Sequence, residues 1–148
     1  MSSRRQVRRV AVQALYLLDA GADPVVDELL EDLTESPGDG RTHRDGVELA
    51  VAAWAEHAIA DPLIEAQTPE WPINRQPVVD RSILRLAYHE MTSGVTPPKV
   101  AINEAVELAK EFSTERSPMF INGVLDKLYR DLRDAGTLPE PEAATNDA

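Results

Sequence analysis

The residues best suited to chemistry gather at the start of the chain, among the first sixteen positions. On a helical wheel, a stripe falls within about 80° on the side away from the apolar positions: Arg5, Arg9, Gln13 and Tyr16. Arg4 and Arg8 border this stripe. Guanidinium groups hold phosphates bidentately, and unpaired bases stack on aromatic rings. The pattern predicts a small platform for single-stranded nucleic acid. The alternative is that Tyr16 packs against a neighbouring helix and the arginines only make the surface soluble.

A second candidate surface lies near the end of the chain. One wheel sector away from the apolar face holds Asn122, Asp126, Tyr129 and Arg133. Amide and carboxylate groups can hydrogen-bond base edges, and an aspartate accepts from an exocyclic amine. Gly123 costs about 1 kcal/mol inside a helix. Either another helix or a ligand backbone therefore approaches Gly123 closely, or the fold tolerates this loss of stability. The alternative for the whole sector is an ordinary solvated face.

A third candidate is the segment 78–93, which is apolar on two sides. One stripe holds Val79, Ile83 and Leu86, and the other holds Leu84, Tyr88 and Met91. Asp80 lies beside the second stripe, and Arg81 and Arg85 border it on the other side. An apolar strip edged by charge is typical of a protein contact. We therefore expect Asp80, Arg81, Leu84 and Tyr88 to meet a protein partner, unless both stripes belong to the core.

Composition restricts the class of protein. The chain has 148 residues, 43% of them hydrophobic, which suits one folded domain. It carries 15 Lys and Arg against 26 Asp and Glu, for a net charge of −11. Since residues 1–18 hold arginines and no acid, any phosphate-binding surface must be local and must lie near the start.

Several kinds of site are missing from the sequence. With no cysteine, the chain has no disulfide framework, Cys-ligated zinc site or thiol nucleophile. The histidines are isolated, and no glycine-rich phosphate loop or nucleophile elbow occurs. We expect no metal, no cofactor and no enzymatic activity. No apolar run approaches the roughly 18 residues of a membrane span, and no secretory signal is evident. We therefore expect a cytoplasmic protein.

The elements that must position these residues are all helical. Apolar positions recur at helical spacing over about 3–19, 43–60, 78–93, 100–112 and 118–134. Asp23-Pro24 predicts a short acidic helix after it, and Asp61-Pro62 predicts a short helix or a kink over 62–67. The fold class is therefore all-α, with six to seven helices. We expect a domain over 1–135 and a disordered acidic tail over 136–148.

Four motifs resemble one known family. RRVAVQALY, VDRSILRLAYHE, VAINEAVELAKEFS and FINGVLDKL are similar, in order and spacing, to the NusB family of bacterial transcription antitermination factors. The similarity covers about residues 4–130. It implies two small packed helical bundles, no catalysis and binding to the boxA element of nascent ribosomal RNA leader transcripts. The family binds this RNA as a heterodimer with NusE, which is also a small-subunit ribosomal protein.

The resemblance also implies a larger assembly. The complex joins RNA polymerase and other Nus factors and suppresses premature, Rho-dependent termination. Arg4, Arg5 and Arg8 match the arginine-rich RNA-binding start of the family, Tyr16 matches its RNA-facing aromatic residue, and Asp126 matches a position at the RNA. Asp80 matches an acidic position in the NusE contact, with Arg81 and Leu84 nearby. The resemblance does not say whether the free protein is a monomer or a homodimer.

Two other functions also fit a NusB-like sequence. NusB-like domains also begin some ribosomal RNA cytosine-5 methyltransferases, where they present RNA to an enzyme. Such enzymes carry a following cofactor-binding α/β domain with a catalytic cysteine, and this sequence has no cysteine. The other alternative is a NusB-like protein that has lost RNA binding and makes only protein contacts.

Overall fold

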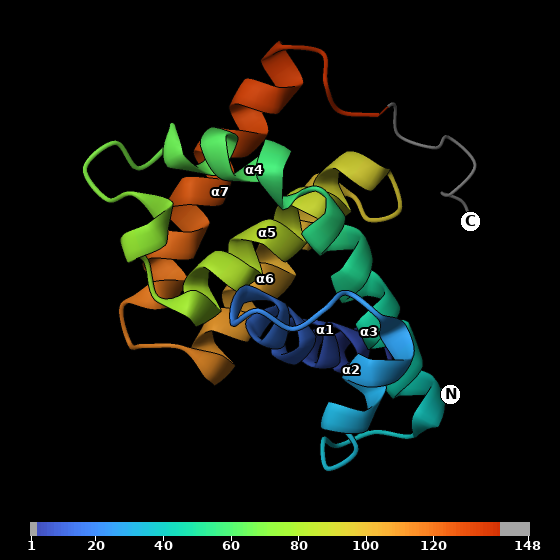
Figure 1. Cartoon of the computed structure of the whole chain (residues 1–148). Helices are drawn as coiled ribbons and strands as arrows, with labels where there is room; N and C mark the ends of the chain where they lie inside the picture. Colours follow the sequence, from blue (N-terminus) through green and yellow to red (C-terminus); the bar gives the residue numbers. More distant parts are fainter. Residues whose placement is uncertain (1–2, 140–148) are drawn as a thin grey trace.

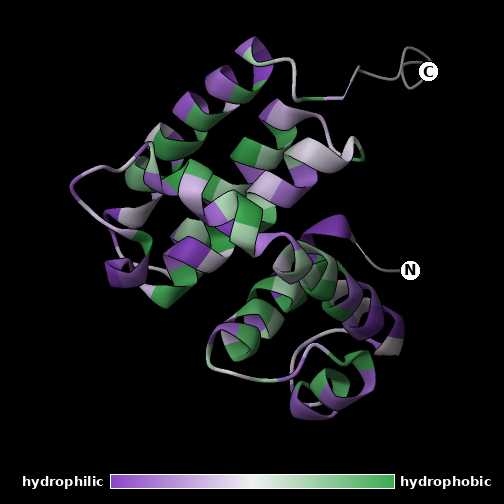
Figure 2. Cartoon of the chain, turned by 45° about the horizontal axis from the view of Figure 1, so that its top comes forward, coloured by the Kyte–Doolittle hydropathy of each residue, from purple (hydrophilic) through white to green (hydrophobic). Residues whose placement is uncertain are grey.

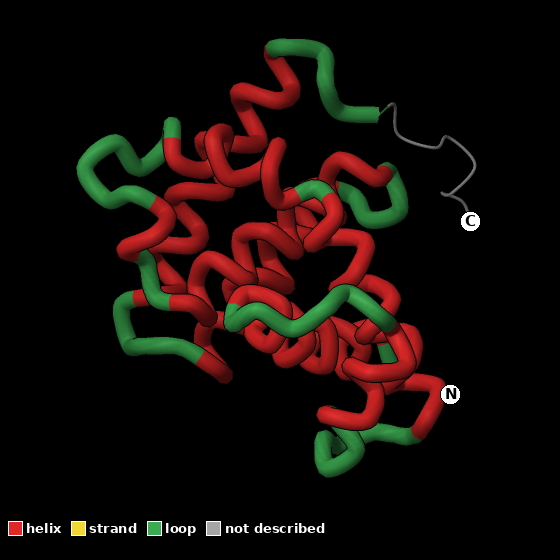
Figure 3. Tube along the Cα trace, in the orientation of Figure 1, coloured by secondary structure: helices red, strands yellow, loops and turns green. Residues whose placement is uncertain are grey.

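The computed structural model describes residues 3–139, and every regular element in that range is a helix (Figure 3). The all-α prediction is therefore confirmed. The helices are α1 (Arg4–Asp19), α2 (Val26–Asp32), α3 (Gly40–Ala55), α4 (His57–Glu65), α5 (Val78–Ser93), α6 (Pro98–Phe112) and α7 (Ser117–Asp134), with a 3₁₀ turn at Ile73–Arg75. None of the helices within residues 3–139 is long and apolar enough to cross a membrane.

Local sequence signals set both ends of α1. The Ser3 side chain accepts a hydrogen bond from the Gln6 amide and caps the first turn. At the other end, Gly21 has a φ of 110°, which a residue with a Cβ rarely adopts. The amides of Gly21 and Ala22 then donate to the last carbonyls of the helix. The orientation of the arginine-bearing helix is thus fixed by short-range chemistry.

The helices form two groups, as expected for two small bundles. Helices α1, α2 and α3 pack together, while α4, α6 and α7 pack around α5 (Figure 1). Helix α5 also contacts α1 and α3, so it joins the groups. This central position explains its two apolar stripes, since helices pack on more than one side of α5. In both groups, apolar residues cover the sides of the helices that face one another (Figure 2).

Helices α1 and α3 approach closely at Gly46. A Cβ built on Gly46 would lie 2.5 Å from the Val10 Cβ and 2.8 Å from the Val7 carbonyl oxygen. Only glycine leaves room for this contact. The backbone of α3 therefore supports the buried side of α1 directly, and the opposite side of α1 remains at the surface.

The expected helix over 43–60 is divided in two. Helix α3 ends at Ala55, and α4 begins at His57, whose ring stacks on Trp54 with centroids 3.8 Å apart. Asp61 does not cap a new helix, as Asp61-Pro62 suggested, but lies inside α4. Its carboxylate accepts from Arg85 at 2.9 Å, and this tertiary contact overrides the local signal.

The first four residues of the expected tail, 136–139, are described by the structure. Gly136 has a φ of 73°, and the Thr137 amide donates to the Leu132 carbonyl, which closes the end of α7. Leu138 packs against the core. Residues 136–139 are therefore held against the folded domain by the packing of Leu138. The rest of the predicted tail, 140–148, lies outside the described residues.

Candidate nucleic-acid and protein interfaces

The outer side of α1 is built as the sequence predicted around Tyr16. The Tyr16 side chain lies at the surface with 49% exposure, so it is not packed inside the fold. Gln13 lies one turn earlier and is half-buried, and its side-chain oxygen accepts from Ser36 at 2.7 Å. The amide nitrogen of Gln13 is not used in that bond. A ring face and amide donors are therefore available side by side on α1.

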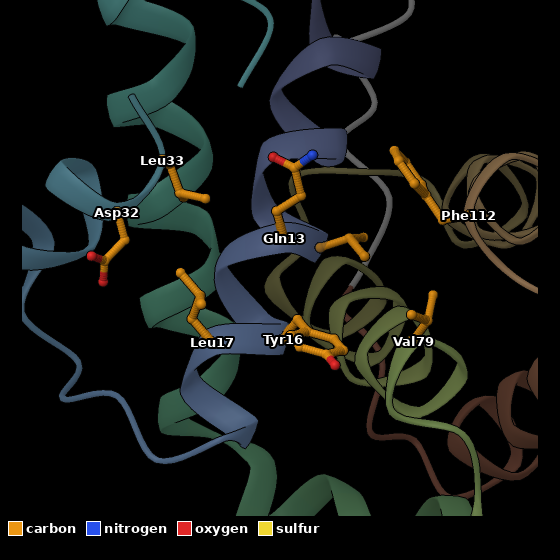
Figure 4. A pocket seen from close by; sticks show the side chains of 8 residues that line it. Gln13, Tyr16, Leu17, Asp32, Leu33, Val79 and Phe112 are labelled. Atoms are coloured by element: carbon orange, nitrogen blue, oxygen red, sulfur yellow. The ribbon is translucent and has the colours of Figure 1, made fainter. Parts of the chain in front are cut away.

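A shallow pocket of about 300 Å³ lies against this part of α1. Figure 4 shows Gln13 and Tyr16 on the α1 ribbon, Leu33 of the α2 end on one side and Val79 and Phe112 on the other. The remaining lining residues are Val12, Leu17 and Asp32. The lining is mostly apolar and includes two aromatic rings, so it suits a flat unsaturated group better than a phosphate.

Arg5 and Arg9 point to the surface but are paired with glutamates of α6. Arg5 donates from two nitrogens to both oxygens of Glu104, at 3.1 and 2.9 Å. Arg9 donates from Nε to Glu111 at 2.9 Å. The hydrogen bond from Arg5 lowers the pKa of the Glu104 carboxyl and raises the pKa of Arg5 itself. Both carboxylates therefore occupy hydrogen-bond donors of these two arginines.

Arg8 is not at the surface, which corrects the wheel analysis. It is 5% exposed and donates to both oxygens of Glu90, a buried residue of α5, at 2.9 and 3.1 Å. Thr96 also donates to Glu90, and Arg4 lies 3.6 Å from it. The wheel assumed one buried side for α1, but α1 packs against both α3 and α5. Arg8 lies in the second contact, so it fixes α1 on α5.

The α7 surface is only partly as predicted. Asn122 and Gly123 are exposed, and Asp126 pairs with Arg130 at 2.9 Å. No atom lies within 4 Å of a Cβ built on Gly123, so no neighbouring helix explains this glycine. Tyr129 and Arg133 are in cation–π contact at 5.5 Å. The surface is open, but it belongs to the other helix group from α1.

The apolar strip predicted to meet a protein partner is buried, so its expected exposure is wrong. Asp80 is 2% exposed, Leu84 is fully buried and Tyr88 is 7% exposed. The Asp80 carboxylate accepts from Ser113 and Ser117, which fixes the loop between α6 and α7. Apart from Val79, which is partly buried and lines the pocket beside Tyr16, both stripes of α5 are core because helices cover both sides. Nothing in the amino-acid pattern separates a central helix from one that shares a face with a partner.

Arg81 joins two elements and is only partly exposed. Its Nε and Nη2 donate to the Asp19 carboxylate at 2.8 and 2.6 Å, and its Nη1 donates to the carbonyl of Ile73 at 3.2 Å. Arg85 donates to the same Asp19 carboxylate at 2.6 Å. The hydrogen bond from Arg81 holds the pKa of Asp19 below its ordinary value. Arg81 thus ties the end of α1 to the start of α5.

Sequence reasoning missed the acidic partners of the arginines. These partners are Glu104 and Glu111 on α6 and Glu90 on α5, none of which is among the candidate residues named from the sequence. A usable signal was present, since the segment 100–112 carries glutamates on one face and the first helix carries the only early cluster of arginines. Phe112 of α6 is partly buried against the core and also lines the pocket beside Tyr16. No group of three metal-ligating side chains occurs within residues 3–139.

Comparison with known proteins establishes the family. Residues 5–130 match the NusB family. The chain is 42% identical over 145 residues to the transcription antitermination protein NusB of Solibacter usitatus, covering 97% of this chain and 95% of that one. The chain belongs to the NusB family. The NusB protein of Chloroflexus aggregans is 40% identical over 128 residues, with 84% and 85% of the two chains covered.

Solved structures of NusB proteins share the fold. NusB of T. maritima superposes with a TM-score of 0.71 at 32% identity, over 88% of this chain and 94% of that one. A NusB chain from a structure of the antitermination factors NusB and NusE with double-stranded RNA gives a TM-score of 0.73 at 26% identity, covering 86% and 96%. The two-bundle arrangement described above is thus the NusB fold.

Proposed function

We propose that this NusB-family chain is a cytoplasmic transcription antitermination factor without catalytic activity. It binds the boxA element of ribosomal RNA leader transcripts together with NusE, and the complex helps RNA polymerase to resist premature Rho-dependent termination. Support comes from the family match over residues 5–130 and from the likeness to a NusB chain solved with NusE and RNA.

The observation that carries the RNA-binding proposal is the outer side of α1. An exposed tyrosine, a glutamine with unused amide donors and surface arginines lie within four turns of one helix. The arginines of this surface are ion-paired with glutamates, but Arg5 and Arg9 remain partly exposed beside the tyrosine. An unpaired base stacks on Tyr16 or enters the adjacent apolar pocket, and Arg5 and Arg9 hold the neighbouring phosphates. Base stacking together with phosphate contacts is suited to single-stranded RNA.

The other proposed RNA residues contribute in different ways. Arg4 is exposed at the start of α1 and adds positive charge. Arg8 acts through its buried pair with Glu90, which holds α1 in place. Asn122 and Asp126 of α7 offer an amide and a carboxylate to base edges. Because α1 and α7 lie in different helix groups, an RNA that meets both must run across the molecule.

NusE is the proposed protein partner, but its contact with α5 must be indirect at the buried positions. Asp80 shapes the loop between α6 and α7, while Leu84 and Tyr88 set the packing beneath the surface. Arg81 is the member of the predicted set that keeps partial exposure. We propose that these residues affect NusE binding mainly through the shape of the surface around α5.

A binding assay with a boxA oligoribonucleotide over a salt series tests this function. The protein with NusE should bind boxA RNA more tightly than a scrambled RNA of equal length. Tyr16→Ala should weaken binding at least about fivefold, because stacking on an aromatic side chain contributes about 1–3 kcal/mol per base. Ile59→Ala on α4, which removes an even more exposed apolar group, is the control. Equal binding of both RNAs, or no effect of Tyr16→Ala, would contradict the proposal.

A further inference from the structure

An acidic row on α6 faces the arginines of α1. Glu104, Glu107 and Glu111 occur at i, i+3 and i+7, so they share one side of the helix. The first and last of them reach across to a different helix, whereas Glu107 pairs with Lys110 of its own helix at 3.2 Å. The row therefore contains two glutamates that bind α1 and one that does not.

The contact between Arg5 and Glu104 has the geometry of phosphate recognition. Two guanidinium nitrogens meet the two carboxylate oxygens at 3.1 and 2.9 Å, which is the parallel fork that an arginine also presents to a phosphate. Glu104 Oε1 also lies 3.8 Å from Arg8 Nη1. Arg9 and Glu111 form a single hydrogen bond at 2.9 Å, and both side chains are partly open to solvent.

These contacts have a cost for RNA binding. Arg5 still has unused donors on Nη1, so a phosphate can approach its other edge. A carboxylate about 3 Å from the guanidinium nevertheless cancels most of the field that the phosphate would meet. The RNA must then displace the glutamate or bind a nearly neutral pair. In either case the carboxylate weakens the phosphate contact.

We propose that Glu104 and Glu111 act as built-in competitors of RNA phosphates for Arg5 and Arg9. This inference rests on the proposed RNA-binding function and adds a control of affinity to it. Backbone phosphates are common to all RNA and supply non-specific binding. The two glutamates offset that non-specific contribution. Selection of one RNA sequence over another then depends on base contacts around Tyr16 and on the partner protein.

The test compares three glutamine variants in the full chain bound to NusE. Glu104→Gln and Glu111→Gln free an arginine, while Glu107→Gln removes the same charge from the same helix without freeing one. Binding of a fluorescent boxA oligoribonucleotide is measured by anisotropy over a salt series. We expect Glu104→Gln and Glu111→Gln each to tighten binding about 3- to 10-fold at low salt, and Glu107→Gln clearly less.

The salt dependence separates competition from a structural effect. A freed arginine that gains a phosphate should steepen the slope of log K against log salt by about 0.7. A variant that merely loosened α1 would not steepen it. If all three variants tighten binding equally, or if the two paired variants bind no better than the unaltered protein, the competitor role is wrong. If the unaltered complex does not bind boxA RNA at all, the proposed function fails first, and this inference fails with it.

Discussion

The carboxylate beside each arginine of α1 decides what that arginine can do. Arg5 and Arg9 meet glutamates at the rim of α6 and keep 55% and 38% of their side chains exposed. Arg8, three residues after Arg5, pairs with Glu90 inside the fold and is therefore not available at the surface. The sequence could predict that arginines and Tyr16 cluster on α1. It could not predict which arginine is buried, because that depends on a carboxylate 82 positions away.

Two glycines should respond to alanine in opposite ways. Gly46→Ala should lower the free energy of unfolding by about 1–3 kcal/mol, because its Cβ would overlap Val10 and the Val7 carbonyl. Gly123→Ala should raise it by about 1 kcal/mol, because the site is open and alanine favours a helix. Urea unfolding of both variants measures the two changes. Similar values for the two variants would show that α1 and α3 are not in close contact at Gly46.

Helix α5 determines how the other elements are arranged. The sequence correctly predicted its range of 78–93 and its two apolar stripes, because periodicity alone gives both. It did not show that both stripes are buried, since burial depends on which helices lie around α5. Its charged residues also form hydrogen bonds with neighbouring elements. Glu90 and Arg81 bind α1, and Arg85 binds both α1 and α4. Asp80 binds the start of α7 and the loop before it.

The buried pair of Arg8 and Glu90 should behave as one unit. Replacing Glu90 alone with Met leaves a buried guanidinium without its carboxylate, so we expect a loss of about 3–5 kcal/mol of unfolding free energy. Changing both residues to Met should lower the unfolding free energy by far less than the sum of the two single changes. A double-mutant cycle by urea unfolding gives the coupling. Additive losses would show that the two side chains do not interact in solution.

The junction of α1 and α5 should make stability depend on acid. The hydrogen bond from Arg81 lowers the pKa of Asp19 below its ordinary value of 3.8. Because the folded-state pKa is depressed, this contribution is complete above that ordinary value and is lost as the pH falls through the folded pKa. In Asp19→Asn, the free energy of unfolding should therefore fall less steeply with acidification below about pH 4.

Urea unfolding at several pH values compares Asp19→Asn with the unaltered chain. Asp27→Asn serves as the control, since the Asp27 side chain is 83% exposed and lies 3.3 Å from Arg44 at the surface. An acid dependence of Asp19→Asn that matches the unaltered chain would mean that the pair with Arg81 contributes nothing to folding.

At the scale of the whole molecule, the proposed RNA-binding residues belong to a protein with a net charge of −11. The family motifs, which occur along nearly the whole domain, gave the two-bundle fold and the proposed function. They did not show that α6 supplies acidic partners to α1, or that the α1 and α7 surfaces lie in separate helix groups. The pairs between α1 and α6 join residues about 100 positions apart in the chain, which no local pattern reveals.

The central claim is that unpaired RNA lies on the outer side of α1, over Tyr16 and its pocket. Ultraviolet crosslinking of boxA RNA to the complex with NusE, followed by mass spectrometry of the peptides, tests it most directly. We expect the main crosslink at Tyr16, within the tryptic peptide of residues 10–41. The crosslink should be lost in Tyr16→Ala. Crosslinks confined to α3 or α4, with none on α1, would contradict the claim.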